Sequence, residues 1–278
     1  MPGQLTSGPT CKPERYGIYK QTNAIRTMST TASLAGKVAV ITGGSKGIGA
    51  ATATALSKLG AKVVLNYNSD SKAAESLVSK LGGADHALAV QANASTIDGV
   101  EHLVSETVKH FKQIDILIPN AGVLPMKDIE STTEQDFDRT FTMNVKGPYF
   151  LVQKAIPHMS KGGSIVLLST TQNHASTVAP PYTLYCCTKG AIEQLGKLLS
   201  KDLQAKHGIR VNVVAPGPTG TDLFYEGKSE QVVNTIASFN PNKRIGTPEE
   251  VADTIAFLSG DGARWISGQT ILVNGGQA

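Results

Sequence analysis

Short apolar runs alternate with longer segments of helical periodicity from Lys37 to the end of the chain. The runs carry apolar residues at consecutive positions, which is typical of strands that are buried on both faces. The segments between them repeat apolar residues at helical spacing, which predicts amphipathic helices. The predicted strands span residues 37–42, 62–67, 86–91, 114–118, 164–168, 210–214 and 270–273, and the predicted helices span residues 47–59, 71–81, 97–111, 135–160, 183–206 and 248–259.

This alternation continues without an internal repeat, a linker or a low-complexity tract that would divide the chain. Parallel strands joined by helices require right-handed crossovers, and these crossovers build a doubly wound α/β fold. We therefore predict one domain over residues 34–278, with a seven-stranded parallel sheet flanked by helices. Only residues 217–245, a polar stretch with aromatic residues, depart from the pattern.

Residues 1–33 differ from the rest because they are polar, rich in Ser and Thr, and without apolar periodicity. Four basic residues and one acidic residue give this segment +3 of the chain's formal net charge of +4. We expect a disordered tail. The alternative is a mitochondrial targeting segment, which the basic composition permits but which lacks a convincing amphipathic face.

The remaining residues are nearly neutral, which gives no support for a nucleic-acid or membrane surface. The longest apolar run near the middle, residues 165–168, is far too short to span a membrane. The three cysteines, Cys11, Cys186 and Cys187, do not make a disulfide framework, so we expect a reducing, cytoplasmic setting. The six histidines lack metal-ligand spacing, and we predict no metal site.

A glycine-rich turn at residues 42–49 (Thr-Gly-Gly-Ser-Lys-Gly-Ile-Gly) joins the first predicted strand to the first predicted helix. Gly43, Gly47 and Gly49 allow a tight turn and a close approach of the backbone to phosphate. The start of the helix offers free N–H groups and the positive end of its dipole. This context is typical of a dinucleotide-binding unit, and the predicted domain is therefore Rossmann-like.

The residues at the end of the second predicted strand help to distinguish an NAD site from an NADP site. NAD enzymes usually place an Asp or Glu there for the ribose hydroxyls, whereas residues 66–69 read Asn-Tyr-Asn-Ser. We expect Asp70, the next carboxylate, to lie past the reach of the ribose. Lys46 stands inside the glycine turn, where its ammonium can pair with a 2′-phosphate. These features favour NADP (NADPH) over NAD.

Tyr185 and Lys189 are four residues apart in the predicted helix 183–206 and therefore share one face. A free tyrosine has a pKa of about 10, which is too high for efficient proton exchange at neutral pH. Lowering the pKa by about three units requires roughly 4 kcal/mol, which an ammonium about 4 Å away supplies at an effective dielectric of about 20. We predict that Tyr185 is the general acid of a carbonyl reduction and that Lys189 lowers its pKa.

Residues 34–278 resemble the short-chain dehydrogenase/reductase family in its compact single-domain form, over nearly their whole length. Residues 42–49 resemble its cofactor turn, residues 120–122 (Asn-Ala-Gly) its motif after the fourth strand, and Tyr185 with Lys189 its Tyr-x-x-x-Lys pair. Residues 66–69 with residues 221–222 (Thr-Asp) also resemble the fungal hydroxynaphthalene reductases, less specifically.

The resemblance implies an NAD(P)-dependent oxidoreductase acting on a carbonyl/alcohol pair. It implies that Asn144 holds a water between Lys189 and solvent, and that the catalytic hydroxyl belongs to Thr170 or to Ser169 before it; both stay candidates. The cofactor-binding residues that we expect are Gly43, Ser45, Lys46, Gly47, Ile48, Gly49, Asn66, Tyr67, Asn68, Ser69, Asn93, Asn120, Ala121, Gly122, Tyr185, Lys189, Pro216, Gly217, Thr219 and Thr221.

Residues 222–245 are predicted to form a lid over the substrate, with Gly227 and Gly246 as hinges. Phe224, Tyr225 and Phe239 in this stretch indicate a flat or apolar ketone. Cys186 and Cys187 lie beside Tyr185 in the sequence, but we expect them to fill core space or a subunit contact.

The leading prediction is an NADPH-dependent carbonyl reductase acting on a small-molecule ketone. The alternatives are an NAD(P)-dependent alcohol, steroid or sugar dehydrogenase, and a non-catalytic NADP-binding sensor or scaffold. Members of the resembling family are commonly tetramers or dimers joined through helices that correspond here to residues 135–160 and 183–206. We therefore expect a homotetramer or homodimer.

Overall fold

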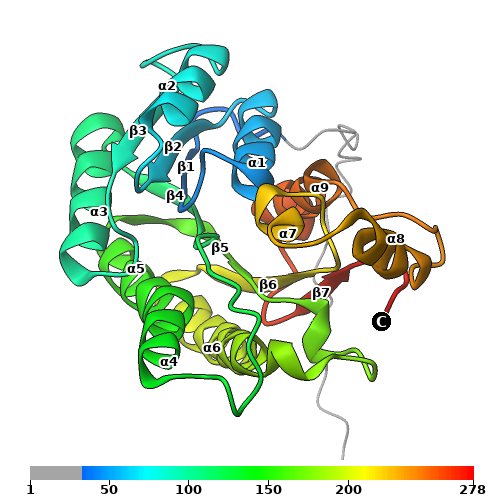
Figure 1. Ribbon diagram of the computed structural model, residues 1–278. Coiled ribbons are helices and arrows are strands. Elements are labelled where there is room, and N and C mark those ends of the chain that lie inside the picture. The colour runs from blue at the N-terminus through cyan, green and yellow to red at the C-terminus, as the bar shows by residue number, and fades with distance from the viewer. Residues whose placement is uncertain (1–32) are drawn as a thin grey trace, which may run out of the picture. The chain divides into compact units, whose positions relative to one another are not determined.

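The computed structural model describes residues 33–278, so the tail or targeting segment predicted for residues 1–33 lies, except for Ser33, outside the described residues. The described residues build one parallel sheet with the strand order β3-β2-β1-β4-β5-β6-β7 (Figure 1). The strands are β1 (Val38–Ile41), β2 (Lys62–Tyr67), β3 (Ala87–Gln91), β4 (Ile114–Ile118), β5 (Met159–Leu168), β6 (Arg210–Pro216) and β7 (Thr270–Val273). The predicted fold class, a doubly wound seven-stranded α/β sheet, is confirmed.

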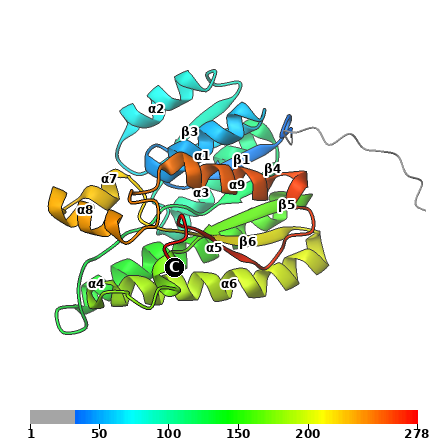
Figure 2. The same cartoon turned by 90° about the vertical axis from the view of Figure 1, so that its right-hand side faces the viewer.

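Helices cover both faces of this sheet, and Figure 2 shows α1, α2 and α9 above it and α4, α5 and α6 below it. The helices are α1 (Gly47–Lys58), α2 (Ser71–Lys80), α3 (Ile97–Phe111), α4 (Glu134–Phe141), α5 (Gly147–Ala155), α6 (Thr183–His207), α7 (Asp222–Tyr225), α8 (Glu230–Ser238) and α9 (Pro248–Ser259).

The strand side chains explain why two layers of helices are needed. In β1, Val38 and Val40 join the apolar core under α3, α5 and α6, whereas Ala39 and Ile41 join the core under α1 and α9. Successive side chains of a strand point to opposite faces, so a strand of consecutive apolar residues must be covered on both sides.

Local signals set the ends of several helices. Thr247 caps α9, where its hydroxyl accepts from the Glu250 N–H and the Glu250 carboxylate accepts from the Thr247 N–H. Gly208 ends α6 in the left-handed region with φ of +67°. Both devices satisfy backbone groups that a helix end leaves without partners.

The single long helix predicted over residues 135–160 is wrong. The helix instead runs as α4, then a π-helical turn at Thr142–Lys146, then α5, and β5 already begins at Met159. Pro148 has no N–H for the carbonyl of Asn144, four residues earlier, which removes one α-helical hydrogen bond at this point. The wider π turn that results carries Asn144, and such turns are frequent at functional sites.

The stretch 217–245 also contains more structure than the sequence indicated. It forms α7 and α8, and its two ends are joined by a bridge between Thr219 and Gly246. The predicted lid is therefore connected to the rest of the domain at one place, where its two ends pair.

Candidate active site

The glycine turn between β1 and α1 lies at the carboxyl end of β1, where the strand order runs to β2 on one side and to β4 on the other. Gly43 and Gly47 have φ of +60° and +51°, which favour glycine. A β-carbon at Gly49 would lie 2.2 Å from the Gly43 carbonyl oxygen. These positions have no room for other residues, as close packing around a dinucleotide turn requires.

The first turn of α1 is suited to an anion. Lys46 stands at its N-cap without a capping side-chain hydrogen bond, and no acidic residue lies in the first turn. The N–H groups at this end are therefore open to a phosphate, and the helix dipole favours the negative charge. The residues present thus fit the pyrophosphate of a dinucleotide.

Asn120 and Ala121 lock this turn to the end of β4. Asn120 Nδ2 donates to the carbonyl of Thr42 at 2.9 Å and to that of Gly43 at 3.2 Å. The backbone N–H groups of Asn120 and Ala121 both donate to Thr42 Oγ1 at 3.0 Å. The predicted cofactor motif at residues 120–122 therefore shapes the glycine turn.

We expected Asn66 to bind the cofactor, but its side chain makes its hydrogen bonds inside the protein. It is only 2% exposed, and its Nδ2 donates to the Ala92 carbonyl at 2.8 Å while its Oδ1 accepts from the Gly43 N–H at 3.4 Å. The amide is thus occupied inside the protein, where it braces the glycine turn against β3. Strand periodicity explains this, because Asn66 points to the opposite face from Leu65 and Tyr67.

Lys46 and Asp70 form an ion pair, with Lys46 Nζ 2.6 Å from Asp70 Oδ2. The expectation that Asp70 lies past the reach of the ribose stays a prediction, but its carboxylate does meet the lysine of the glycine turn. Asp70 also caps α2 by accepting from the Ala73 N–H at 3.0 Å, which holds the carboxylate in place. The hydrogen bond between the two side chains raises the pKa of Lys46 and lowers that of Asp70.

The other predicted cofactor residues lie along the same edge of the sheet. Asn68, Ser69 and Asn93 are exposed there, and Ser45, Ile48 and Tyr67 are half-buried. On the far side, Pro216 ends β6 and Gly217 N–H donates to the Val273 carbonyl at 2.9 Å. Thr219 is buried, and Thr221 caps α7 while its methyl group faces Gly47.

Lys189 lies beneath the end of β5. It is 6% exposed, and its Nζ donates to the Leu168 carbonyl at 2.8 Å. The same Nζ lies 5.7 Å from the centre of the Tyr185 ring. A β-carbon at Gly122 would lie 3.7 Å from Lys189 Nζ and 3.3 Å from Asn144 Oδ1, so the motif at residues 120–122 reaches the Tyr185/Lys189 pair.

We expected Lys189 to lower the pKa of Tyr185, but the pKa of Tyr185 is raised. Loss of hydration and the nearby Cys186 thiol raise the pKa of Tyr185, and only a hydrogen bond with the Thr170 side chain acts in the opposite direction. Burial also lowers the pKa of Lys189 to about 8. Desolvation of both groups therefore outweighs the attraction between their charged forms.

The structure separates the two candidate hydroxyl groups. Ser169 Oγ points into α6, where it donates to Glu193 Oε1 at 2.6 Å. Thr170 Oγ1 instead accepts from the Gln172 N–H at 3.3 Å and lies close enough to the Tyr185 phenol to act on its pKa. Both are buried, with 4% and 7% of their surface exposed. This geometry favours Thr170 as the hydroxyl beside a reacting carbonyl.

Asn144 is buried in the π turn, with 1% of its surface exposed. Its Oδ1 accepts from the Val123 N–H at 2.9 Å, and its Nδ2 donates to the Val123 carbonyl at 2.9 Å and to Thr188 Oγ1 at 3.1 Å. The amide therefore ties the loop after residues 120–122 to α6. Its expected role in holding a water stays a prediction.

The cysteines beside Tyr185 differ in exposure, with Cys186 half-buried and Cys187 exposed. Burial raises the pKa of the Cys186 thiol to about 11, which keeps it protonated and a poor nucleophile. Within residues 33–278, no three His, Cys, Asp or Glu side chains gather as metal ligands would. Over the same residues, no helix is both long and apolar enough to cross a membrane.

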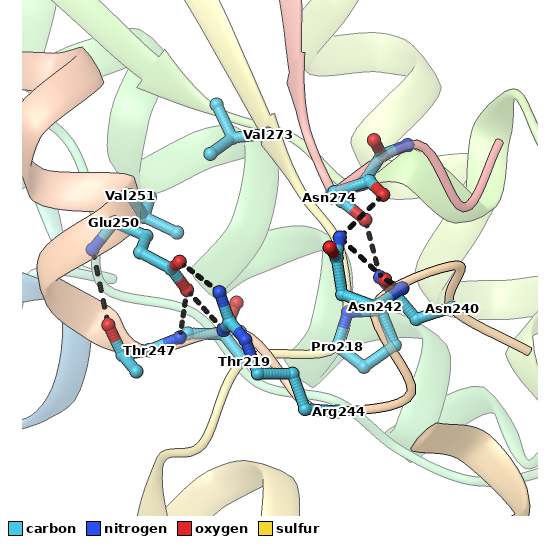
Figure 3. Close-up of a pocket in the computed structure, with 12 residues that line it drawn as sticks. Pro218, Thr219, Asn240, Asn242, Arg244, Thr247, Glu250, Val251, Val273 and Asn274 are labelled. Atoms are coloured by element: carbon cyan, nitrogen blue, oxygen red, sulfur yellow. Dashed lines mark hydrogen bonds and ion pairs between the residues drawn. The ribbon is translucent and has the colours of Figure 1, made fainter. Parts of the chain in front are cut away.

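A cavity of about 150 Å³ lies at the base of the lid (Figure 3). Asn240 Nδ2 donates to the Asn274 carbonyl at 2.7 Å, and the Arg244 guanidinium pairs with the Glu250 carboxylate. Asn242 lies beside Asn240, and its N–H donates to Asn240 Oδ1 at 2.8 Å. These contacts anchor the returning end of the lid to α9 and to the C-terminal segment, and the sequence pattern gave no sign of them.

Comparison with known proteins extends over the same region. A family profile described as enoyl-(acyl carrier protein) reductase matches residues 43–278. Versicolorin reductase 1 of Aspergillus parasiticus is 39% identical over 262 residues, which cover 90% of this chain and 99% of that protein. An NADPH-dependent aldehyde reductase-like chloroplastic protein of Arabidopsis thaliana is 37% identical over 256 residues, which cover 87% and 94%.

Among solved structures, a short-chain dehydrogenase of Burkholderia cenocepacia in complex with NADP has a TM-score of 0.82 and 32% identity. The match covers 88% of this chain and 98% of that one. The likeness therefore includes the sheet and the elements that carry the site.

Proposed function

Because the chain belongs to the short-chain dehydrogenase/reductase family and is an NAD(P)-dependent oxidoreductase, we propose that it is an NADPH-dependent carbonyl reductase. The observation that carries this proposal is the meeting of Thr170, Tyr185 and Lys189 at the ends of β5 and α6. Gly122 and Asn120 connect this group to the glycine turn. These contacts support a proton donor and a dinucleotide turn that act together at one edge of the sheet.

The proton step belongs to Tyr185. Because burial raises its pKa, the phenol is protonated at neutral pH, and transfer of its Oη proton to a ketone oxygen depends on groups that stabilise the phenolate. The Thr170 hydroxyl, which lies beside that phenol, is suited to polarise the same oxygen. Below pH 8 the Lys189 amine is charged and favours the negative charge that develops on Tyr185. NADPH, when bound, supplies the hydride.

The alternative is an NAD(P)-dependent alcohol, steroid or sugar dehydrogenase, which would use the same groups in reverse with Tyr185 as the base. Cofactor preference in a turnover assay distinguishes the two proposals.

NADPH is the proposed cofactor on two grounds. Lys46 is the cation of the glycine turn, and residues 66–69 at the end of β2 offer no carboxylate against a 2′-phosphate. The Arabidopsis relative is described as NADPH-dependent, and the Burkholderia structure holds NADP. Asp70 competes for Lys46, so we expect the preference over NADH to be moderate.

The proposed substrate is an aromatic, polyketide-like ketone. Leu223, Tyr225 and Phe239 of the lid expose 47%, 48% and 67% of their surface, so they offer apolar contact area for a flat molecule. The fungal relative named versicolorin reductase supports this choice. We further propose that the enzyme is cytoplasmic and acts as a homo-oligomer, most simply a homotetramer, joined through the outer faces of α4, α5 and α6.

The proposal is tested by following NADPH oxidation over a panel of aromatic ketones and quinones, with NADH in parallel. We expect Tyr185→Phe to lower kcat by roughly 10²–10⁴-fold, because the general acid is lost. NADPH affinity, measured by nicotinamide fluorescence, should stay within about threefold. Thr170→Ala should lower kcat by roughly 10²-fold.

Thr170→Ser is the matched control, because it keeps the hydroxyl and should keep most of the activity. Turnover by Tyr185→Phe at the wild-type rate would refute the assigned acid. Preference for NADH would refute the cofactor. Tight NADPH binding with no turnover over the whole panel would point to a non-catalytic sensor.

A further inference from the structure

A carboxylate that the proposed reaction does not use lies one helical turn beyond Lys189 on α6. Glu193 Oε1 accepts a hydrogen bond from Ser169 Oγ at 2.6 Å and from Asn173 Nδ2 at 3.2 Å. His174 Nε2 lies 3.2 Å from Oε1 and 3.1 Å from Oε2 of the same residue. One side chain therefore binds three others, and all three belong to residues 169–174.

These partners lie on both sides of Thr170 in the sequence. Ser169 precedes it, Asn173 ends the 3-10 turn Thr171–Asn173 that follows it, and His174 comes directly after that turn. The opposite side of the segment is held by β6, because the Ser169 N–H donates to the Val214 carbonyl at 2.8 Å. Thr170 thus lies in a segment that is held by hydrogen bonds to β6 on one side and to Glu193 on the other.

We propose that Glu193 is a positioning residue for the reaction, which holds residues 169–174 against α6 so that the Thr170 hydroxyl stays beside the Tyr185 phenol. The inference rests on the proposed function, because it assumes that Thr170 acts on the substrate oxygen. Tyr185, Lys189 and Glu193 follow one another at four-residue steps. The helix α6 therefore carries both the proposed acid, Tyr185, and the residue that holds the Thr170 segment, Glu193.

The experiment compares Glu193→Ala with Glu193→Gln and with Gln194→Ala, an exposed neighbour on the same helix as matched control. We expect Glu193→Ala to lower kcat by roughly 10–10²-fold with KM nearly unchanged, because a small misplacement of a catalytic group is costly. Glu193→Gln keeps an acceptor for Ser169 Oγ and should recover most of the loss. Equal losses in both variants would contradict the acceptor role.

A double-mutant cycle separates positioning from general damage. If Glu193 acts through Thr170, then Glu193→Ala should cost at most about threefold in kcat when Thr170→Ala is already present. The same 10–10²-fold loss in both backgrounds would overturn the proposal. Wild-type kcat in Glu193→Ala would overturn it as well.

Hydrogen exchange measured by mass spectrometry gives a readout without turnover. Amides of residues 169–174 should exchange faster in Glu193→Ala and Ser169→Ala than in wild type, with the glycine turn unchanged. Unchanged exchange in this segment would refute the positioning role. A wild-type protein without turnover would refute the proposed function instead, and the exchange result would still decide whether Glu193 holds the segment.

Discussion

At the scale of single residues, burial of Lys189 has a cost that depends on pH. Its pKa of about 8 lies below the ordinary value of 10.5, so between these values the unfolded chain binds more protons than the folded one. The free energy of unfolding therefore rises with pH through this window, and the charged amine destabilises the fold below pH 8 by roughly 3 kcal/mol at most.

Lys189→Met should abolish turnover but raise the free energy of unfolding at pH 7 by about 1–2 kcal/mol, since the lost hydrogen bond to Leu168 offsets part of the gain. The advantage over wild type should shrink towards pH 10, as measured by urea unfolding at several pH values. Lys197→Met, at an exposed position on the same helix, is the control. An advantage that does not change with pH would contradict the assigned burial cost.

The sequence predicted which residues meet in this site better than it predicted their pKa shifts. The spacing of Tyr185 and Lys189 placed them on one face of a helix, which is a local property of the sequence. The direction of the Tyr185 pKa depends on how much water the fold removes from it, and spacing carries no information on that. Burial likewise decided that Asn66 faces inward and that Ser169 faces Glu193 rather than a substrate.

At the scale of elements, α5 and its π turn are held by one close contact. A β-carbon at Gly147 would lie 2.3 Å from the Ala94 carbonyl oxygen, in the loop before α3. Gly147→Ala must therefore push α5 and Asn144 away from this loop. We expect a loss of about 1–3 kcal/mol in the free energy of unfolding, together with reduced turnover.

Gly190→Ala in α6 is the matched control for this substitution. A β-carbon there would meet only Asn173 Nδ2, at 3.8 Å, and alanine is the better helix former. The control should melt at or slightly above the wild-type temperature, whereas Gly147→Ala should melt below it. Equal melting temperatures for the two variants would show that α5 adapts to the larger residue.

The elements that the sequence predicted well are those with strong, uniform patterns. The strands at Lys62–Tyr67 and Ile114–Ile118 and the helix at Pro248–Ser259 have the predicted bounds. The helix over residues 135–160 failed because apolar periodicity hardly changes when an α-helix widens by one residue per turn. The contacts that brace the lid base join residues far apart in sequence, such as Asn240 and Asn274, and local patterns cannot show them.

At the scale of the whole molecule, the outer faces of α4, α5 and α6 bear on assembly. Phe137, Tyr149 and Leu198 on these helices expose 48%, 48% and 57% of their surface. Large apolar side chains on neighbouring helices are typical of a protein contact, and a two-fold axis would pair each helix with its copy. We therefore expect light scattering after gel filtration to give a mass above that of one 29.2 kDa chain.

Leu198→Glu should shift the protein towards a smaller species, because a charge placed in a closed apolar contact loses its hydration. Lys72→Glu, at an exposed position on α2, changes the charge in the same direction without touching these helices and should keep the wild-type mass. If activity falls together with mass in Leu198→Glu, then packing of α6 against its copy supports the Tyr185/Lys189 pair that the same helix carries. If the wild-type protein is a monomer, then these helix faces form no subunit contact, and assembly does not support activity.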